Sequence, residues 1–227
     1  MEEVKTVNPI LSLLSSKFVA DPARDKEIIE MEKREKEAEK RQRYQKNVPE
    51  RFWNESIDTY QVQDDNQREC VESVRKFIQQ INCGTFRSLL LVGPPGTGKT
   101  HLACAAIREC GGLYRMAPNI VEEIRRAKSF TSKDTEQEII KRYGEGKLLV
   151  IDEIGRGIAA VDERYMIYQI VNERYNNRKA TILITNYNAG DFINYVGYAT
   201  ADRLAESGHT VVFTSDSYRA KLRNATS

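Results

Sequence analysis

Apolar residues follow two patterns that alternate along the chain from residue 88 onward. Short apolar runs rich in β-prone residues predict strands, and the amphipathic stretches between them, such as Tyr165–Arg174, predict helices. Strands that alternate with helices in this way form a mostly parallel sheet with helices on both faces. The predicted strands are Leu89–Val92, Leu113–Met116, Leu148–Ile151, Thr181–Thr185 and Val211–Phe213.

A further amphipathic helix is predicted just before this alternation. Asn66 and Glu69 form a helix-start signal, and Gly84 is expected to end the helix. Residues 48–84 therefore lead into an α/β domain that we expect to span residues 48–227. The apolar residues on one face of this helix are Val71, Val74, Ile78 and Ile81.

Residues 1–47 show helical signals but no pattern that would build a core. Pro9 and Pro22 stand where proline begins a helix at no cost in hydrogen bonds. From Lys26 to Arg43 the chain is mostly Glu, Lys and Arg, so this stretch has little to bury. The preceding apolar stripe is either a docking helix for another protein or part of a frayed tail. The residues of that stripe are Ile10, Leu11, Leu14 and Phe18.

Composition limits the class of protein. The 227 residues suffice for one α/β domain with a short appendage. A net charge of +2 gives no global reason to expect nucleic-acid binding, although a local basic groove is compatible with it.

No stretch approaches the roughly 20 apolar residues that span a bilayer, and the first residues lack the positive region of a signal peptide, so we expect a cytoplasmic protein with no membrane contact. Four cysteines without a CxxC pair are expected to be reduced thiols, with Cys104 in the core: Cys70, Cys83, Cys104 and Cys110.

The strongest chemical signal is the segment from Gly93 to Thr100, which reads GPPGTGKT. It follows a predicted strand and opens a predicted helix that runs to Cys110, which is the context that a GxxxxGK[ST] motif requires. Its glycines let backbone N–H groups turn towards phosphates, and the positive end of the helix faces the same point. Lys99 is expected between the β- and γ-phosphates, and the Thr100 hydroxyl is expected to ligate Mg²⁺. The motif therefore predicts an ATP–Mg²⁺ site.

Polar side chains at the ends of two other predicted strands complete the expected site. Asp152 and Glu153 follow the strand 148–151, at the end of the sheet where α/β proteins bind ligands. Asp152 is expected to hold Mg²⁺ through water, and Glu153 to polarise the attacking water. Asn186 follows the strand 181–185, and its amide either orients water against the γ-phosphate or merely starts a turn.

These motifs, taken in order, resemble those of the DnaC/DnaI/IstB-like branch of AAA+ ATPases. The likeness covers roughly residues 48–222 and consists of VPERF, GPPGTGKTH, LLVIDEIG, TILITN, ADRL and SYR. It implies a P-loop NTPase (AAA+) domain with a five-stranded, mostly parallel sheet between helices, preceded by a small helical segment. Few residues follow SYR, so no separate lid domain is expected. The nucleotide-binding residues that the resemblance implies are Gly93, Pro94, Pro95, Gly96, Thr97, Gly98, Lys99, Thr100 and His101.

The same resemblance implies roles for two arginines. Arg203 would be the arginine finger that reaches the γ-phosphate of a neighbouring subunit, and Arg219 would be the sensor-II arginine of its own subunit. A guanidinium can neutralise charge on a transferred phosphoryl group, although from the residues alone either arginine could form a surface salt bridge. If Arg203 acts on a neighbour, the site is complete only in an assembly, and ATP-dependent self-assembly is expected.

The favoured hypothesis is an ATP-dependent replicative-helicase loader acting in DNA replication. Residues 1–47 would bind the replicative DNA helicase, and the ATPase domain would bind ATP and single-stranded DNA. Some relatives hold zinc through N-terminal cysteines, but residues 1–69 contain none, so the helicase contact is expected from helical residues 8–46. The alternatives are an IstB-like transposition helper ATPase and a nucleotide-binding adaptor without turnover. Glu153, Asn186 and Arg203 favour a slow ATPase over the adaptor.

The DNA-binding surface is weakly marked in the sequence. Basic residues next to an aromatic side chain can follow a single strand and stack its bases. Such a cluster is also typical of a solvated helix face, and both interpretations stay open. The candidates are Arg125, Arg126 and Lys128, near Phe130, together with Arg156.

Overall fold

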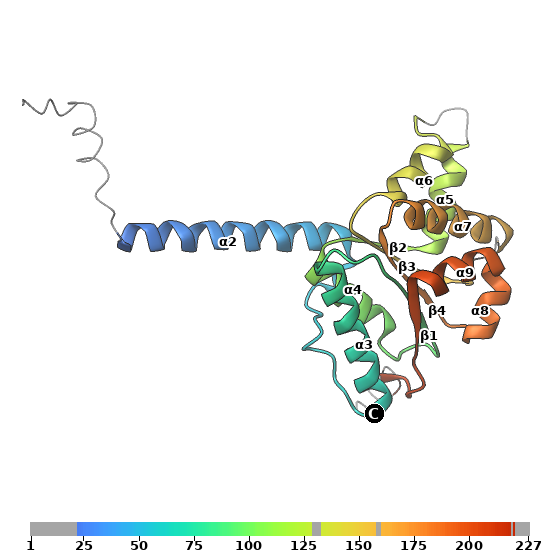
Figure 1. Ribbon diagram of the computed structural model, residues 1–227, viewed down its shortest axis with the longest axis horizontal. Helices are drawn as coiled ribbons and strands as arrows, with labels where there is room; N and C mark the ends of the chain where they lie inside the picture. The colour runs from blue at the N-terminus through green and yellow to red at the C-terminus, as the bar shows by residue number, and fades with distance from the viewer. Residues whose placement is uncertain (1–21, 129–132, 158–159, 219, 221–227) are drawn as a thin grey trace, which may run out of the picture. The chain divides into compact units, whose positions relative to one another are not determined.

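The computed structural model describes residues 22–128, 133–157, 160–218 and 220, and Figure 1 shows their arrangement. The chain divides into two compact units, Met1–Gln42 and Arg43–Ser227. In the described ranges, no helix has both the length and the apolar character that crossing a membrane requires.

A five-stranded sheet organises the second unit. Its strand order is β2-β3-β4-β1-β5, and every neighbouring pair is parallel. All residues of β1 and β4 are buried, as expected of strands that helices cover on both faces. The predicted five-stranded, parallel α/β fold is therefore confirmed. The strands are β1 Ser88–Val92, β2 Leu113–Met116, β3 Leu148–Ile154, β4 Ala180–Thr185 and β5 Gly208–Val212.

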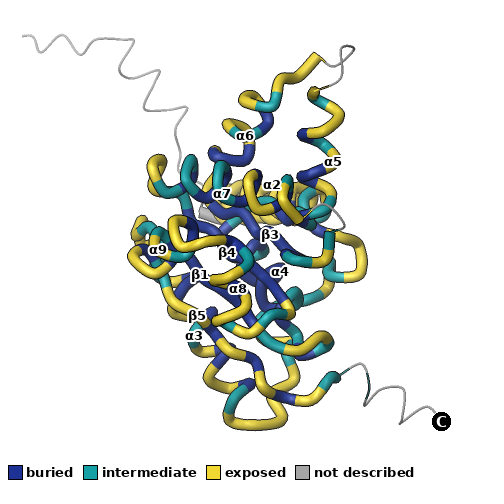
Figure 2. Tube along the Cα trace, turned by 90° about the vertical axis from the view of Figure 1, so that its right-hand side faces the viewer, coloured by how far each residue is buried: buried dark blue, intermediate teal, exposed yellow. Residues whose placement is uncertain are grey.

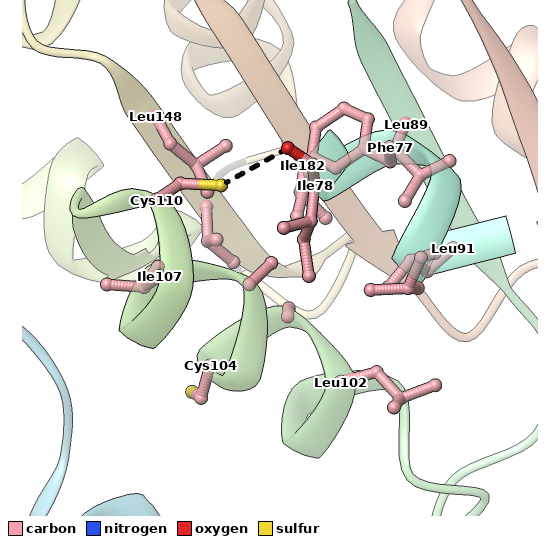
Figure 3. Packing of buried hydrophobic residues seen from close by; sticks show 14 of the residues in the cluster. Phe77, Ile78, Leu89, Leu91, Leu102, Cys104, Ile107, Cys110, Leu148 and Ile182 are labelled. Atoms are coloured by element: carbon pink, nitrogen blue, oxygen red, sulfur yellow. Dashed lines mark hydrogen bonds between the residues drawn. The ribbon is translucent and has the colours of Figure 1, made fainter. Parts of the chain in front are cut away.

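Helices cover both faces of this sheet, and alternate strand residues face opposite layers. Leu89 and Leu91 belong to a core that includes side chains of α3 and α4, shown in Figure 3 with the fully buried Cys104. Leu90 and Val92 belong to a second core that includes side chains of α5 to α9. Figure 2 shows the strands as the buried centre between these layers. The helices are α3 Asp65–Asn82, α4 Lys99–Cys110, α5 Ala117–Ala127, α6 Glu136–Gly144, α7 Ala160–Asn176, α8 Ala189–Val196 and α9 Tyr198–Ser207.

Two strands, β5 and β3, differ from their predicted limits, because backbone pairing decides where each strand begins and ends. Strand β5 was predicted at Val211–Phe213 but begins at Gly208, which pairs with Ser88. It lies at the edge of the sheet, so its first residues can be polar and partly exposed. These residues pair with β1 through the backbone, and no apolar run in the sequence indicates them. Strand β3 continues past the predicted Ile151, through an irregularity, to Ile154, which pairs with Thr185.

The start of α3 was also predicted at the wrong residue. Asp64, and not Asn66, caps the helix, because its carboxylate accepts a hydrogen bond from the Gln67 backbone N–H at 2.8 Å. The Asn66 amide instead donates to the Val212 carbonyl at 2.9 Å and accepts from the Thr214 N–H at 2.9 Å. Asn66 therefore ties α3 to the end of β5.

A long polar helix, α2, spans Pro22–Asn47 and begins at the proline that the sequence indicated. Its residues 24–43 are all exposed, in agreement with a segment that has little to bury. The helix ends inside the second unit, where Tyr44 and Val48 join the first core. The predicted apolar stripe at residues 10–18 lies outside the described residues.

Arg174, on α7, is the largest fully buried side chain. Its guanidinium donates to the Tyr143 and Glu145 carbonyls at 2.7 Å each, to the Ala180 carbonyl at 2.5 Å and to the Thr181 hydroxyl at 3.0 Å. Burial lowers its pKa to about 10, so the group stays charged at neutral pH. This one side chain joins α7, β4 and the turn after α6.

We expect Arg174→Lys to lower the free energy of unfolding by about 3 kcal/mol or more, because one ammonium cannot satisfy acceptors on three segments and would leave some of them buried without a donor. Urea denaturation measures the change. Arg164→Lys, at an exposed position of the same helix, should stay within about 0.5 kcal/mol. Equal stability of the two variants would contradict the role given to Arg174.

Candidate active site

The loop between β1 and α4 forms a compact cradle. Gly98 precedes α4 with a φ of 93°, in the left-handed region that favours glycine. The Lys99 side chain is buried, and its Nζ donates to the carbonyls of Gly93 and Pro94 at 2.7 Å each. The Thr97 hydroxyl donates to the Pro94 carbonyl at 3.0 Å and closes the loop on itself. A cation and the N-terminus of a helix thus lie together, which suits an anion such as a phosphate.

The end of β3 meets this cradle. The Thr100 hydroxyl donates to Asp152 Oδ2 at 2.7 Å, although the two residues are 52 positions apart. A hydroxyl and a carboxylate are the oxygen ligands that Mg²⁺ prefers, so these two residues fit that ion. Among the described residues, no three His, Cys, Asp or Glu side chains are grouped as metal ligands. Further ligands to Mg²⁺ would therefore come from nucleotide phosphates and water.

Two more donors hold the Asp152 carboxylate. The Glu153 backbone N–H donates to Oδ1 at 2.7 Å, and the Tyr114 hydroxyl donates to Oδ2 at 3.0 Å. Burial, followed by the neighbouring Asp152, raises the pKa of Tyr114 above its usual range, so the phenol is a stable donor. Tyr114 was not predicted as a site residue, because it lies inside a short strand and belongs to no nucleotide-binding motif.

Glu153 and Asn186 occupy the carboxyl ends of neighbouring strands. Glu153 has a φ of 58°, which is uncommon outside glycine, and lies in the irregular part of β3. Backbone strain of this kind is concentrated at functional sites. The Glu153 carboxylate pairs with Arg156 at 3.3 Å, and Asn186 is exposed directly after β4. Both residues therefore lie at the carboxyl edge of the sheet, the edge from which the loop between β1 and α4 also leaves.

Two irregular segments cover the cradle. The Tyr60 hydroxyl donates to the Thr97 carbonyl at 2.8 Å, and its ring lies so close to Gly98 that an added Cβ would be 2.4 Å away. From the other end of the chain, the Tyr218 N–H donates to the Gly96 carbonyl at 2.9 Å. Tyr60 was not predicted as a site residue, since its segment has no periodic pattern.

The ring of His101 faces the segment before α3. Its Nδ1 lies 3.1 Å from the Glu55 carboxylate, its Nε2 lies 2.7 Å from the Ser56 carbonyl, and its ring meets Tyr60 edge-on at 5.2 Å. This side chain therefore fastens the segment 55–60 to α4. A nucleotide contact by His101 stays a prediction.

Of the two arginines implied by the resemblance, the structure describes Arg203 but not Arg219. Arg203, on α9, donates to the Ala199 carbonyl at 2.9 Å and lies over the rings of Tyr168 and Tyr175 at 5.5 and 5.9 Å. These contacts belong to α7 and α9, not to the cradle of the same chain. Arg219 lies outside the described residues. Both roles stay predictions.

The basic residues considered for DNA binding have acidic partners. Arg125 pairs with Asp162, Arg126 with Glu122, Lys128 with Glu136, and Arg156 with Glu153. Phe130, the aromatic candidate beside them, lies outside the described residues. Such pairing is typical of a solvated helix face and weakens these positions as a DNA-binding surface.

A phosphate cradle after β1, an aspartate in β3 and the strand order β2-β3-β4-β1-β5 together define a P-loop protein of the AAA+ class. The chain belongs to the family of IstB-like ATP binding proteins, whose sequence profile matches residues 14–226. The predicted resemblance is thereby confirmed.

Individual relatives agree with this assignment. The chain is 29% identical to the replicative helicase loader DnaC of Escherichia coli K12 over 175 residues, which are 74% of this chain and 70% of that protein. It is 29% identical over 144 residues to a putative ATP-binding protein of insertion sequence IS232 from Bacillus thuringiensis, covering 59% and 56%. A crystal structure of the DnaC helicase loader matches with a TM-score of 0.65 and 25% identity, over 73% of this chain and 100% of that one.

We expect Gly98→Ala to weaken ATP binding at least tenfold, a loss of about 1.4 kcal/mol. An alanine is strained in the left-handed region by about 1–2 kcal/mol, and its Cβ would displace the Tyr60 ring from the loop. Fluorescence titration with a labelled ATP measures the affinity. Gly190→Ala, in α8, is the control, because its Cβ would meet no atom closer than 3.4 Å. Unchanged affinity in Gly98→Ala would contradict the cradle described above.

Proposed function

We propose that this protein is an ATP-dependent loader of a replicative DNA helicase. The observation that carries the proposal is the contact between Thr100 and Asp152, which brings the two expected Mg²⁺-binding residues together beside the phosphate cradle in a chain of the IstB-like family. Similarity to proteins named as replicative helicase loaders, over about three quarters of the chain, supports the choice of partner. A loader of this kind would act in the cytoplasm, where the DNA is.

The cradle residues would bind different parts of the nucleotide and its magnesium ion. Lys99 would exchange its contacts with the Gly93 and Pro94 carbonyls for the β- and γ-phosphates. The Thr100 hydroxyl would offer a lone pair to Mg²⁺ while it still donates to Asp152, which would hold the ion through water. Mg²⁺ would neutralise charge on the phosphates.

Hydrolysis would depend on the ends of β3 and β4. Glu153 would polarise the attacking water once its exposed ion pair with Arg156 opens, and such pairs are weak. Asn186 would orient that water. Arg203 would reach the γ-phosphate of a neighbouring copy, so that ATP promotes self-assembly, and Arg219 would act on its own nucleotide. Turnover would be slow, and the protein would work as a switch.

Partner binding is divided between the two parts of the chain in this proposal. Residues 1–47 would bind the helicase, because α2 is almost wholly exposed up to Arg43 and leaves its side chains available. The domain 48–227 would bind single-stranded DNA during loading. The paired basic residues of α5 do not by themselves provide that surface.

A transposition helper ATPase is the second candidate. Similarity to the ATP-binding protein of an insertion sequence favours it, although over a smaller share of the chain. The two candidates share the ATP site and differ in their partner, which would be a transposase in place of a helicase. A direct binding experiment with the two partners separates them.

We expect the purified full chain to capture the replicative helicase of its own organism, and a chain that lacks residues 1–42 to lose that capture. The truncation ends at Gln42 because Tyr44 and Val48 belong to the core of the ATPase domain. Size-exclusion chromatography with and without ATP measures the complex. Retained binding of labelled ATP is the folding control for the truncated chain. Failure of the full chain to bind the helicase would defeat the loader proposal.

Glu153→Gln is expected to lower ATP hydrolysis by about 10²–10⁴-fold, because an amide cannot accept the proton of the attacking water. ATP affinity should stay within about twofold, a change below about 0.5 kcal/mol, since Glu153 holds no phosphate in this proposal. Phosphate release with helicase and DNA present measures the rate, and Arg156→Gln controls for loss of the ion pair alone. Undetectable ATP hydrolysis by the wild-type chain with helicase and DNA present, together with unchanged loading by Glu153→Gln, would favour the adaptor without turnover.

A further inference from the structure

Tyr114 lies against the residue that would hold magnesium, but it belongs to no nucleotide-binding motif. It is the second residue of β2 and pairs with Val150 of β3, two residues before Asp152. Its side chain is 8% exposed and packs in the first core, while its hydroxyl donates to Asp152 Oδ2 at 3.0 Å. The hydroxyl therefore reaches Asp152 from a ring that packs in the first core.

The hydrogen bonds of Asp152 can be counted. An ionised carboxylate has about four lone-pair positions, two on each oxygen. Oδ2 accepts from Thr100 at 2.7 Å and from Tyr114 at 3.0 Å, which fills both of its positions. Oδ1 accepts from the Glu153 backbone N–H at 2.7 Å, which leaves one position. A magnesium-bound water that donates to Asp152 therefore has one place to do so, on Oδ1.

The three donors to the Asp152 carboxylate differ in how freely they can move. The Glu153 N–H is fixed by the backbone of β3, and the Tyr114 hydroxyl is fixed by a ring buried in the core. The Thr100 hydroxyl rotates about its Cα–Cβ bond and would also serve the ion. Without Tyr114, only one rigid donor would remain, and the carboxylate could turn about it and offer either oxygen.

We propose that Tyr114 is a positioning residue for magnesium, which fixes the Asp152 carboxylate so that Oδ1 alone faces the water of the ion. The proposal rests on the ATP–Mg²⁺ site of the proposed function and adds a residue to it. Partners that orient metal ligands in this way change metal affinity by about 10–100-fold when they are removed. A tyrosine kept only for packing would have no such effect, since phenylalanine fills nearly the same space.

The test is Tyr114→Phe, with MgCl2 titrated into the protein and fluorescent N-methylanthraniloyl-ADP. The expected result is a magnesium midpoint raised about 10–100-fold, with affinity for the same nucleotide in EDTA unchanged. The comparison between MgCl2 and EDTA distinguishes a lost magnesium effect from a disturbed fold, because a disturbed fold would weaken nucleotide binding with and without magnesium. Thermal unfolding of the variant confirms that the domain is intact.

Tyr143→Phe is the matched control. Tyr143 is equally buried, and its hydroxyl also donates to a carboxylate, that of Glu123, but it lies in the second core. Its removal should leave the magnesium midpoint where it is in the wild-type chain. A midpoint in Tyr114→Phe equal to the wild-type value would overturn the inference and leave the proposed function standing. A wild-type chain that ignores the nucleotide altogether would overturn both.

Discussion

The hydrogen bond between Thr100 and Asp152 is the contact on which the rest of the site depends. It joins the first turn of α4, the helix that follows β1, to β3, although β4 lies between β1 and β3 in the sheet. Parallel strands bring their carboxyl ends to one edge, and that is how residues 52 positions apart meet. The contact places Thr100, the residue after Lys99 of the cradle, directly against the carboxylate of Asp152.

Around this contact the chain uses segments that have no regular structure. Tyr60 reaches the cradle from before α3, and Tyr218 reaches it from after β5. His101 fastens the segment 55–60 to α4, the helix that carries Lys99 and Thr100. The Arg108 guanidinium, on the same helix, donates to the Trp53 carbonyl at 3.4 Å. The stretch that follows α2 is therefore packed directly on the helix of the phosphate site.

The basic residues considered for DNA binding are paired with carboxylates, and this limits what composition can say about a nucleic-acid surface. Basic and acidic residues are nearly equal in number, 35 and 33, and the candidate DNA-binding arginines each have a carboxylate partner. The buried Arg174 has no carboxylate among its described contacts and donates instead to the carbonyl groups of Tyr143, Glu145 and Ala180. Its position follows from packing and hydrogen bonding, and no charge pattern along the chain would reveal it.

The sequence by itself determined the fold class, the cradle from Gly93 to Thr100 and the acidic pair at Asp152, because these depend on local spacing of apolar, glycine and charged residues. It placed three of the five strands to within one residue for the same reason. Tertiary structure alone decided the limits of β5, the capping of α3 by Asp64, and the contacts of Tyr114 and Tyr60 with the site. These features arise from pairing and packing between distant segments, which leave no periodic trace in the order of residues along the chain.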